Sequence, residues 1–267
     1  MNAHRRLLPL AFSLFAGTLA AQTPGAPFIE QMTWDEIRDA IRAGSTTIIV
    51  PIGGTEQNGP HMVLGKHNYI ITFTAARIAE RLGSTLVAPT VQYVPEGNYS
   101  AADFGQKPGV ISNPSPSYEN LLDAAARSLK VHGFTDIIFI GDSGGNQAGM
   151  TSVADKLNQE WGGSGARVFA LTDYYRKSRE DLRAWLLEKF GYDAATVGSH
   201  AGIADTSQML YVHPEGIRKD RIMPGGGGPD AGVSGDPTKA TAEIGKQAIE
   251  FKVAAAVAQY RALKAAR

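Results

Sequence analysis

Residues 46–52 read TTIIVPI, an apolar and β-branched run in which hydrophobic and polar side chains do not alternate. A run of this kind is typical of a strand that is buried on both faces, as in a parallel sheet. Three further segments are predicted as strands, namely residues 85–91, 136–140 and 166–171. The chain is therefore expected to build a parallel sheet in which residues 46–52 form the first strand.

Segments with helical spacing of apolar residues separate these strands. Thr33 and Glu36 form a capping-box pattern before a short helix that Gly44 closes. Longer helices are predicted over residues 68–82, 115–132, 175–190 and 240–265, and another helix is expected to begin at Gly144. Strands that alternate with helices indicate an α/β fold, here a three-layer sandwich with a mostly parallel sheet flanked by helices.

The composition is that of a folded protein without thiol chemistry. The 267 residues are 43% hydrophobic and 19% charged, with 26 basic and 26 acidic side chains. This balance lacks the basic excess of a nucleic-acid-binding protein. The absence of cysteine excludes thiolate zinc sites, cysteine nucleophiles and disulfides. Any metal site must therefore use histidine, carboxylate, amide or water ligands.

The N-terminus has the three parts of a secretory signal. Two arginines precede an apolar run over residues 7–21, which ends in small residues. This run is too short to span a bilayer. We therefore expect residues 1–21 to be a signal peptide and residues 22–267 to be a single exported domain, periplasmic or secreted, without a membrane segment.

Polar residues gather after three of the predicted elements, in residues 53–68, 141–147 and 198–207. Ligands of open parallel sheets bind at the carboxyl ends of the strands. Three histidines, His61, His67 and His200, fall in these segments. We therefore expect the functional site there.

Five motifs, in order along residues 50–245, resemble those of the creatininase family. They are GTEQNGPH at residues 54–61, PGVIS at 108–112, GGN at 144–146, HAGIADTS at 200–207 and GDP at 235–237. The resemblance implies a creatininase-like α/β domain and a metal-dependent amidohydrolase acting on a small molecule. In such an enzyme divalent ions, often zinc, activate a water that attacks a non-peptide C–N bond, commonly of a cyclic amide. It also implies a homo-oligomer, usually a hexamer.

Four ligand positions of the family differ in this chain. Glu56 is kept, but Asn58 stands in place of a His, and His67 in place of the Asp that bridges two metals. Ser143 replaces another His, and Asp205 replaces a Glu. Two neighbouring cations repel each other unless an anionic oxygen lies between them, so one ion is favoured over two.

From these positions we predict one divalent ion, zinc or alternatively manganese, bound by Glu56, His67 and Asp142. His200 is predicted to protonate the departing nitrogen, with Asp205 as a second catalytic residue. The predicted substrate-binding residues are His61, Lys66, Asn58, Ser143 and Asn146.

Two other functions are compatible with the sequence. The protein can be a metal-free member of the fold that binds a small ligand or a partner without catalysis. Alternatively, residues 141–145 fit the Gly-x-Ser-x-Gly nucleophile elbow, in which Ser143 would act with Asp205 and either His200 or His213. Metal analysis tests the first alternative, and labelling with a fluorophosphonate tests the second.

Overall fold

The computed structural model describes residues 27–98 and 107–266. These residues form a parallel sheet of four strands with helices packed around it. The strand order is β2-β1-β3-β4, and every neighbouring pair is parallel. β1 (Thr47–Ile52) and β3 (Asp136–Gly141) lie at the centre and pair along their whole length. β2 (Thr85–Val87) and β4 (Arg167–Ala170) flank them. The predicted parallel sheet is confirmed.

The strand predicted over residues 85–91 ends earlier than expected, at Val87. Pro89 follows two residues later, and a proline has no N–H with which to continue the ladder. The chain touches the sheet once more, where Val91 forms an isolated bridge with Ile52.

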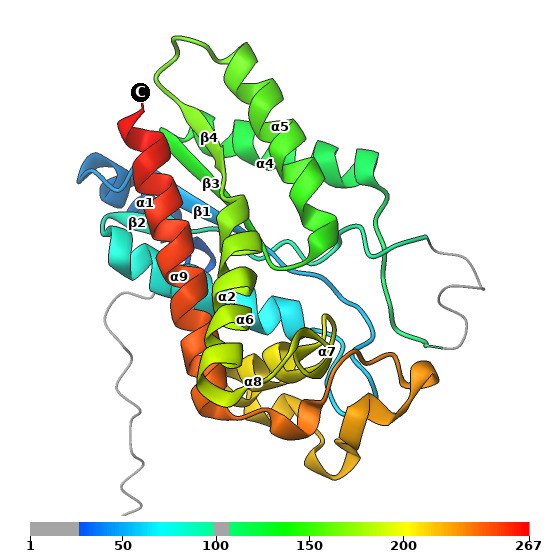
Figure 1. Ribbon diagram of the computed structural model, residues 1–267. Helices are drawn as coiled ribbons and strands as arrows, with labels where there is room; N and C mark the ends of the chain where they lie inside the picture. The colour runs from blue at the N-terminus through cyan, green and yellow to red at the C-terminus, as the bar shows by residue number, and fades with distance from the viewer. Residues whose placement is uncertain (1–26, 99–106, 267) are drawn as a thin grey trace, which may run out of the picture.

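Helices cover both faces of the sheet (Figure 1). α4 (Ser115–Val131) and α5 (Gln147–Glu160) lie on one face, and α2 (Lys66–Leu82) and α9 (Ala242–Ala265) on the other. These helices begin and end within a few residues of the predicted positions. The three-layer α/β sandwich is therefore confirmed.

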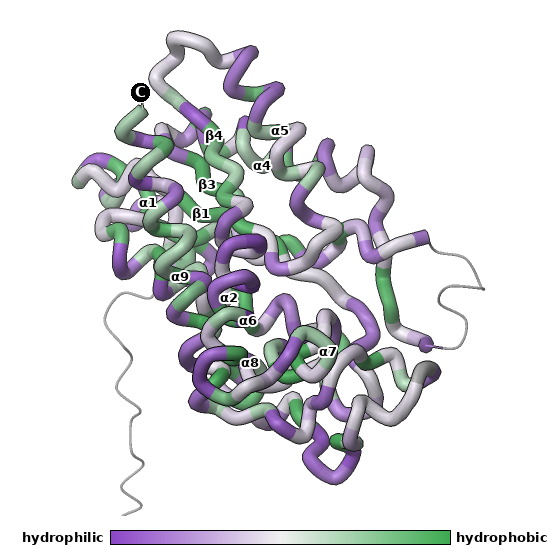
Figure 2. Tube along the Cα trace, in the orientation of Figure 1, coloured by the Kyte–Doolittle hydropathy of each residue, from purple (hydrophilic) through white to green (hydrophobic). Residues whose placement is uncertain are grey.

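Side chains of β1 alternate between two cores, as the period of a strand requires. Ile48 and Val50 pack with α4 and α5, whereas Ile49 packs with α2 and α9. All three are at most 2% exposed, and Figure 2 shows the strands as strongly hydrophobic segments inside the fold. Burial on both faces explains why residues 46–52 contain no polar alternation.

The other α-helices within residues 27–98 and 107–266 are α1 (Trp34–Arg42), α6 (Arg176–Phe190), α7 (Ala194–Val197) and α8 (Ile203–Val212). α6, α7 and α8 share a third apolar cluster with α9. None of the helices in the described ranges is long and apolar enough to cross a membrane.

α8 corrects one expectation, because the sequence predicted no helix between residues 190 and 240, and residues 198–207 were singled out only for their polar side chains. A helix begins inside this segment, at Ile203. It follows a tight turn in which Gly198 and Ala201 both have positive φ angles, of 72° and 52°. The predicted signal peptide, residues 1–21, lies outside the described residues.

The connections place a topological switch point between β1 and β3. The chain runs from β1 through α2 to β2 on one side, and then returns through α4 to β3 on the other side of β1. Ligands of open α/β sheets bind at the carboxyl ends of the strands at such a point. The loop after β1 and the residue after β3 therefore mark the site.

Candidate active site

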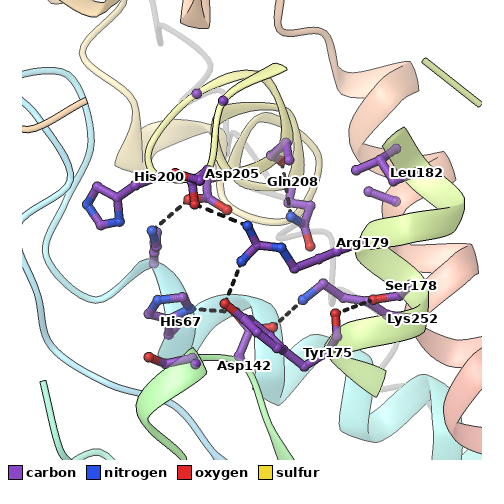
Figure 3. Close-up of a pocket in the computed structure, with 18 of the residues that line it drawn as sticks. His67, Asp142, Tyr175, Ser178, Arg179, Leu182, His200, Asp205, Gln208 and Lys252 are labelled. Carbon is purple, nitrogen blue, oxygen red and sulfur yellow. Dashed lines mark hydrogen bonds and ion pairs between the residues drawn. The ribbon is translucent and has the colours of Figure 1, made fainter. Parts of the chain in front are cut away.

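A pocket of about 230 Å³ lies at the carboxyl ends of β1 and β3. Its walls come from the loop after β1, the first turn of α2, the residue after β3, the helices α6 and α9, and the segment that enters α8 (Figure 3). The charged side chains that line it are Glu56, Lys66, His67, Asp142, Arg179, Arg183, Asp205 and Lys252, together with His200. The fold thus gathers most of the residues that the sequence placed in a site.

Lys66 joins two carboxylates from distant parts of the chain. It is the first residue of α2 and is only 1% exposed. Its Nζ donates to Oε1 of Glu56 at 3.0 Å and to Oδ2 of Asp205 at 2.7 Å. Burial lowers the pKa of Lys66, but the charges of Asp205 and Glu56 outweigh burial and raise it above its usual value. Lys66 is therefore a fixed ammonium ion.

His67 joins Glu56 to a third carboxylate. Its Nε2 lies 2.7 Å from Oε1 of Glu56, and its Nδ1 lies 2.7 Å from Oδ2 of Asp142. A neutral imidazole has one N–H, whereas a carboxylate on each side requires two, so His67 is an imidazolium. Burial and Lys66 lower the pKa of His67, but its hydrogen bonds to Asp142 and Glu56 raise it to about 9.

Asp142 follows β3 directly and ends this series of contacts. Its Oδ1 accepts hydrogen bonds from Tyr174 Oη at 2.9 Å and from Lys252 Nζ of α9. Burial raises the pKa of Asp142, but Lys252 and His67 reduce it below its usual value. Six side chains thus alternate in charge, and we call them the charge chain: Asp205, Lys66, Glu56, His67, Asp142 and Lys252.

His200 differs from His67 in its protonation state. Its Nε2 donates to the carbonyl oxygen of Gln57 at 2.8 Å, and its Nδ1 lies 3.6 Å from Oε1 of Glu56. Burial, followed by the charge of Lys66, lowers the pKa of His200. The ring is therefore neutral at pH 7, with the lone pair of Nδ1 on the Glu56 side.

Asp205 anchors the turn that enters α8. Besides Lys66, its Oδ2 accepts a hydrogen bond from the N–H of Ala201 at 2.8 Å. This bond stabilises Ala201 in the left-handed region, where φ is 52°. Burial raises the pKa of Asp205, but Lys66 and His67 hold it far below its usual range. Asp205 is thus a permanent anion that positions Lys66 and is not suited to proton transfer.

Three of the predicted substrate-binding residues hold loops together and do not line the pocket. Asn58 donates to the carbonyl oxygens of Glu56 and Val63, both at 3.0 Å. His61 contacts Thr206 Oγ1 at 2.9 Å. Asn146 donates to the carbonyl of Gly53 and accepts from the N–H of Ser143. All three side chains are at most 1% exposed, so they stabilise the loops from inside the protein and cannot contact a substrate in the pocket.

Lys66 and Ser143, the other two residues of that group, do line the pocket. Ser143 begins the 3₁₀ turn of residues 144–146, where its Oγ accepts from the N–H of Gly145. The two histidines considered as its base bond elsewhere: His200 to Gln57 and His213 to Glu215. The geometry gives the serine-nucleophile hypothesis no support.

Sequence reasoning missed several residues of the site. Lys252 occupies a position within the apolar stripe of α9, beside Ile249 and Val253, and a lysine there was a usable signal. Arg179 of α6 looked like an ordinary surface residue, but it lines the pocket beside Tyr175 (Figure 3). Glu96, which is near enough for the charge of Glu56 to act on it but does not line the pocket, could not be recognised from its sequence context. Among the described residues its Oε1 is buried without a hydrogen-bond partner, and burial together with the charge of Glu56 raises its pKa to about 7.

The predicted metal ligands come together, but their donor atoms are engaged. Metal ligands must be deprotonated, whereas both ring nitrogens of His67 carry protons, and Glu56 and Asp142 accept from cationic groups. In the described part of the chain, no group of three or more His, Cys, Asp or Glu side chains is arranged to hold a metal ion. This arrangement does not fit zinc or manganese.

The fold and the pocket at its switch point define an α/β protein of the creatininase type. Residues 30–260 match the family model described as creatininase, creatinine amidohydrolase. The match covers most of the sequence, and the chain belongs to the creatininase family.

Relatives of the chain include one named as an amidohydrolase and one named as a peptidase. Creatinine amidohydrolase from Pseudomonas putida is 24% identical over 198 residues, which cover 73% of this chain and 75% of the relative. Mycofactocin precursor peptide peptidase from Mycolicibacterium smegmatis is 25% identical over 222 residues, covering 75% of this chain and 78% of the relative.

Solved structures support the fold. A tryptophan-to-phenylalanine mutant of creatininase superimposes with a TM-score of 0.72 at 22% identity, covering 88% of this chain and 98% of that structure. Other creatininase structures are named as a zinc–zinc form and a manganese form. Proteins with this fold thus include some that are named for a bound metal.

Proposed function

We propose that the protein hydrolyses the C–N bond of a small amide, with a non-peptide, cyclic amide as the preferred substrate. The proposal is supported by membership of a family whose named relatives are an amidohydrolase and a peptidase. It is supported further by a polar pocket at the switch point of the sheet, where a neutral histidine adjoins a carboxylate. The position of His200 beside Glu56 is the observation that carries the proposal.

His200 performs the proton transfers. Its Nδ1 takes a proton from water as the water oxygen bonds to the amide carbon and the carbonyl electron pair moves onto oxygen. The same nitrogen then returns the proton to the leaving nitrogen as the carbonyl re-forms and the C–N bond breaks, which yields a carboxylic acid and an amine. The acid then releases its remaining proton to the solvent. Glu56 stabilises the transient imidazolium, because its pKa is lowered to about 2: burial raises it, but His67 and Lys66 outweigh burial.

The substrate carries a negative group. Three cations of the charge chain, Lys66, His67 and Lys252, are each paired with carboxylates of the chain. Arg179 donates to Tyr175 Oη and the carbonyl oxygen of Ser199, and Arg183 to the carbonyl oxygen of Gly198.

Neither arginine forms an ion pair with a carboxylate of the described residues, so the pocket has surplus positive charge on the α6 side. A carboxylate on the substrate suits this side, since a guanidinium donates two parallel hydrogen bonds to it.

No step of this mechanism passes through a metal. The sequence predicted one zinc or manganese ion at Glu56, His67 and Asp142, and the donor atoms of these residues are bonded to protonated groups instead. The positive charge of the site comes from Lys66, His67 and Lys252, which the carboxylates of the charge chain balance, and from Arg179 and Arg183, which those carboxylates do not balance.

A substrate panel tests the proposal. Cyclic and open-chain amides, each with and without a carboxylate, are incubated with the wild-type protein and with His200→Ala, and the released amine is measured. We expect hydrolysis of carboxylated amides by the wild type and loss of hydrolysis in His200→Ala. Absence of turnover across the panel would contradict the proposal.

A second candidate is a binding protein without catalysis. It is favoured by the charge chain itself, in which the three carboxylates and three cations already satisfy one another. Saturable binding of a carboxylated amide without release of amine would support this candidate against the first.

The cellular setting is a separate proposal that rests on the sequence alone. The mature chain begins near Gln22 after export to the periplasm or the medium, and it assembles as a homo-oligomer, by family resemblance a hexamer. Intact-mass measurement should show the loss of about twenty residues. Light scattering should give a multiple of the monomer mass.

A further inference from the structure

Two carboxylates converge on one point in the pocket wall. Oε1 of Glu56 and Oδ2 of Asp205 both lie within 3.0 Å of the same nitrogen, Nζ of Lys66. Asp205 is 139 residues further along the chain than Lys66, so only the tertiary fold brings them together. Partly buried carboxylates this close to one another repel each other unless a cation lies between them.

The position of Lys66 at the start of α2 places its ammonium group between these two carboxylates. Lys66 begins α2, directly beside His67, and its side chain is 1% exposed. The ammonium group also lies at the meeting of three protein segments: the loop after β1, the start of α2 and the first turn of α8. The ion pairs of Lys66 with Glu56 and Asp205 therefore hold these three segments together.

We propose that the ammonium group of Lys66 is a built-in replacement for a divalent ion. It occupies the point where Glu56 and Asp205 converge, so the site assembles without metal. Removal of the ammonium group leaves two carboxylates that face an emptied space. The imidazole Nδ1 of His200, 3.6 Å from Oε1 of Glu56, then completes a set of two oxygens and one nitrogen. In the described residues as they stand, no such set is arranged around an ion. Without the ammonium group, the two carboxylates are free to close on a zinc ion, with the imidazole as the third ligand.

The inference predicts that the protein gains metal binding when the ammonium group of Lys66 is removed. Wild type, Lys66→Ala and Lys66→Arg are each dialysed against zinc and, separately, manganese, and the bound metal is measured by elemental analysis. Wild type and Lys66→Arg should retain only background metal. Lys66→Ala should retain roughly one ion per chain and bind zinc at least about 10-fold more tightly than wild type.

Two further variants control the result. Lys66→Ala combined with Glu56→Gln should lose the gained metal, because it removes one of the ligands. Lys156→Ala, which removes an exposed lysine paired with Asp123, should behave as wild type. Circular dichroism shows whether each variant is folded.

Two outcomes overturn the inference. One is a stoichiometric ion in the wild-type protein, a measurement that needs no variant and holds even if Lys66→Ala does not fold. The other is a folded Lys66→Ala that binds no more metal than wild type. Because the readout is bound metal and not turnover, failure of the proposed function leaves this inference intact, and the reverse also holds.

Discussion

Nε2 of His67 lies 2.7 Å from Oε1 of Glu56, eleven residues earlier in the sequence. The opposite nitrogen of the same ring lies 2.7 Å from Asp142. With a carboxylate on each side, the ring has no lone pair left for a metal. This contact changes His67 from the predicted metal ligand into a cation of the charge chain.

The first prediction concerns the protonation state of His67. At pH 7.5 we expect ¹⁵N NMR to show two protonated ring nitrogens for this residue. The signals are assigned to His67 because they are absent from the spectrum of His67→Gln. A single protonated nitrogen, or a shift of the signals on addition of zinc, would contradict the proposed state.

The same residue makes stability depend on pH. The pKa of His67 is raised to about 9 in the folded protein, against roughly 6.5 in an unfolded chain. The stabilisation is therefore complete below about pH 6.5 and is lost as the pH rises through about 9, by roughly 3 kcal/mol in total. Urea unfolding across this range should show the fall in wild type and not in His67→Gln.

The sheet and the main helices could be predicted because they follow from local pattern. The apolar runs that became β1 and β3 are buried on both faces, and the helical spacing of residues 240–265 matches α9. α8 was missed because Ala201 adopts a left-handed turn, which depends on the hydrogen bond to Asp205. A left-handed conformation at an alanine cannot be predicted from the neighbouring residues.

The sequence predicted the place of the site and the creatininase family, but not the ion pairs that its charged residues form. His67 and Asp142 are 75 residues apart, and Lys252 lies a further 110 residues beyond Asp142. Whether a histidine binds a metal or carries two protons depends on such distant partners. The hydrogen bonds to Asp142 and Glu56 decide the question, and only the tertiary structure brings Asp142 to the ring.

Lys252 is predicted to matter for stability. Substitution by methionine keeps the length of the side chain and removes the cation from Asp142, both of which are buried. Loss of one partner of a buried pair should lower the free energy of unfolding by about 3 kcal/mol. Lys156→Met, which removes an exposed partner of Asp123, should change it by less than about 0.5 kcal/mol. Equal effects of the two substitutions in urea unfolding would argue against the role assigned to Lys252.

His200→Ala should retain the fold and reduce kcat by roughly 10²–10⁴-fold, as expected for the loss of one acid–base group. His213→Ala is the matched control, because His213 pairs with Glu215 and stacks on Tyr69, and it does not line the pocket. Since His200 must be neutral to accept a proton and its pKa is lowered, activity should fall only below the usual histidine range. Unchanged turnover in His200→Ala would remove His200 from the mechanism.

Arg179 is predicted to recognise the negative group of the substrate. Arg179→Met should raise KM for a carboxylated amide by roughly 10- to 100-fold, the effect of one charge-assisted hydrogen bond. For the same amide without the carboxylate, the two proteins should have equal KM values. A comparable rise in KM for both substrates would mean that the substitution disturbs the pocket as a whole.

The most direct test of the account is the rate of amide hydrolysis before and after removal of metal. Wild-type protein is dialysed exhaustively against EDTA, and its rate is compared with that of untreated protein and of protein supplied with zinc or manganese. The account predicts the same rate in all samples, because Lys66 and His67 provide the positive charge of the site. Loss of activity after EDTA with recovery on addition of zinc or manganese would contradict it.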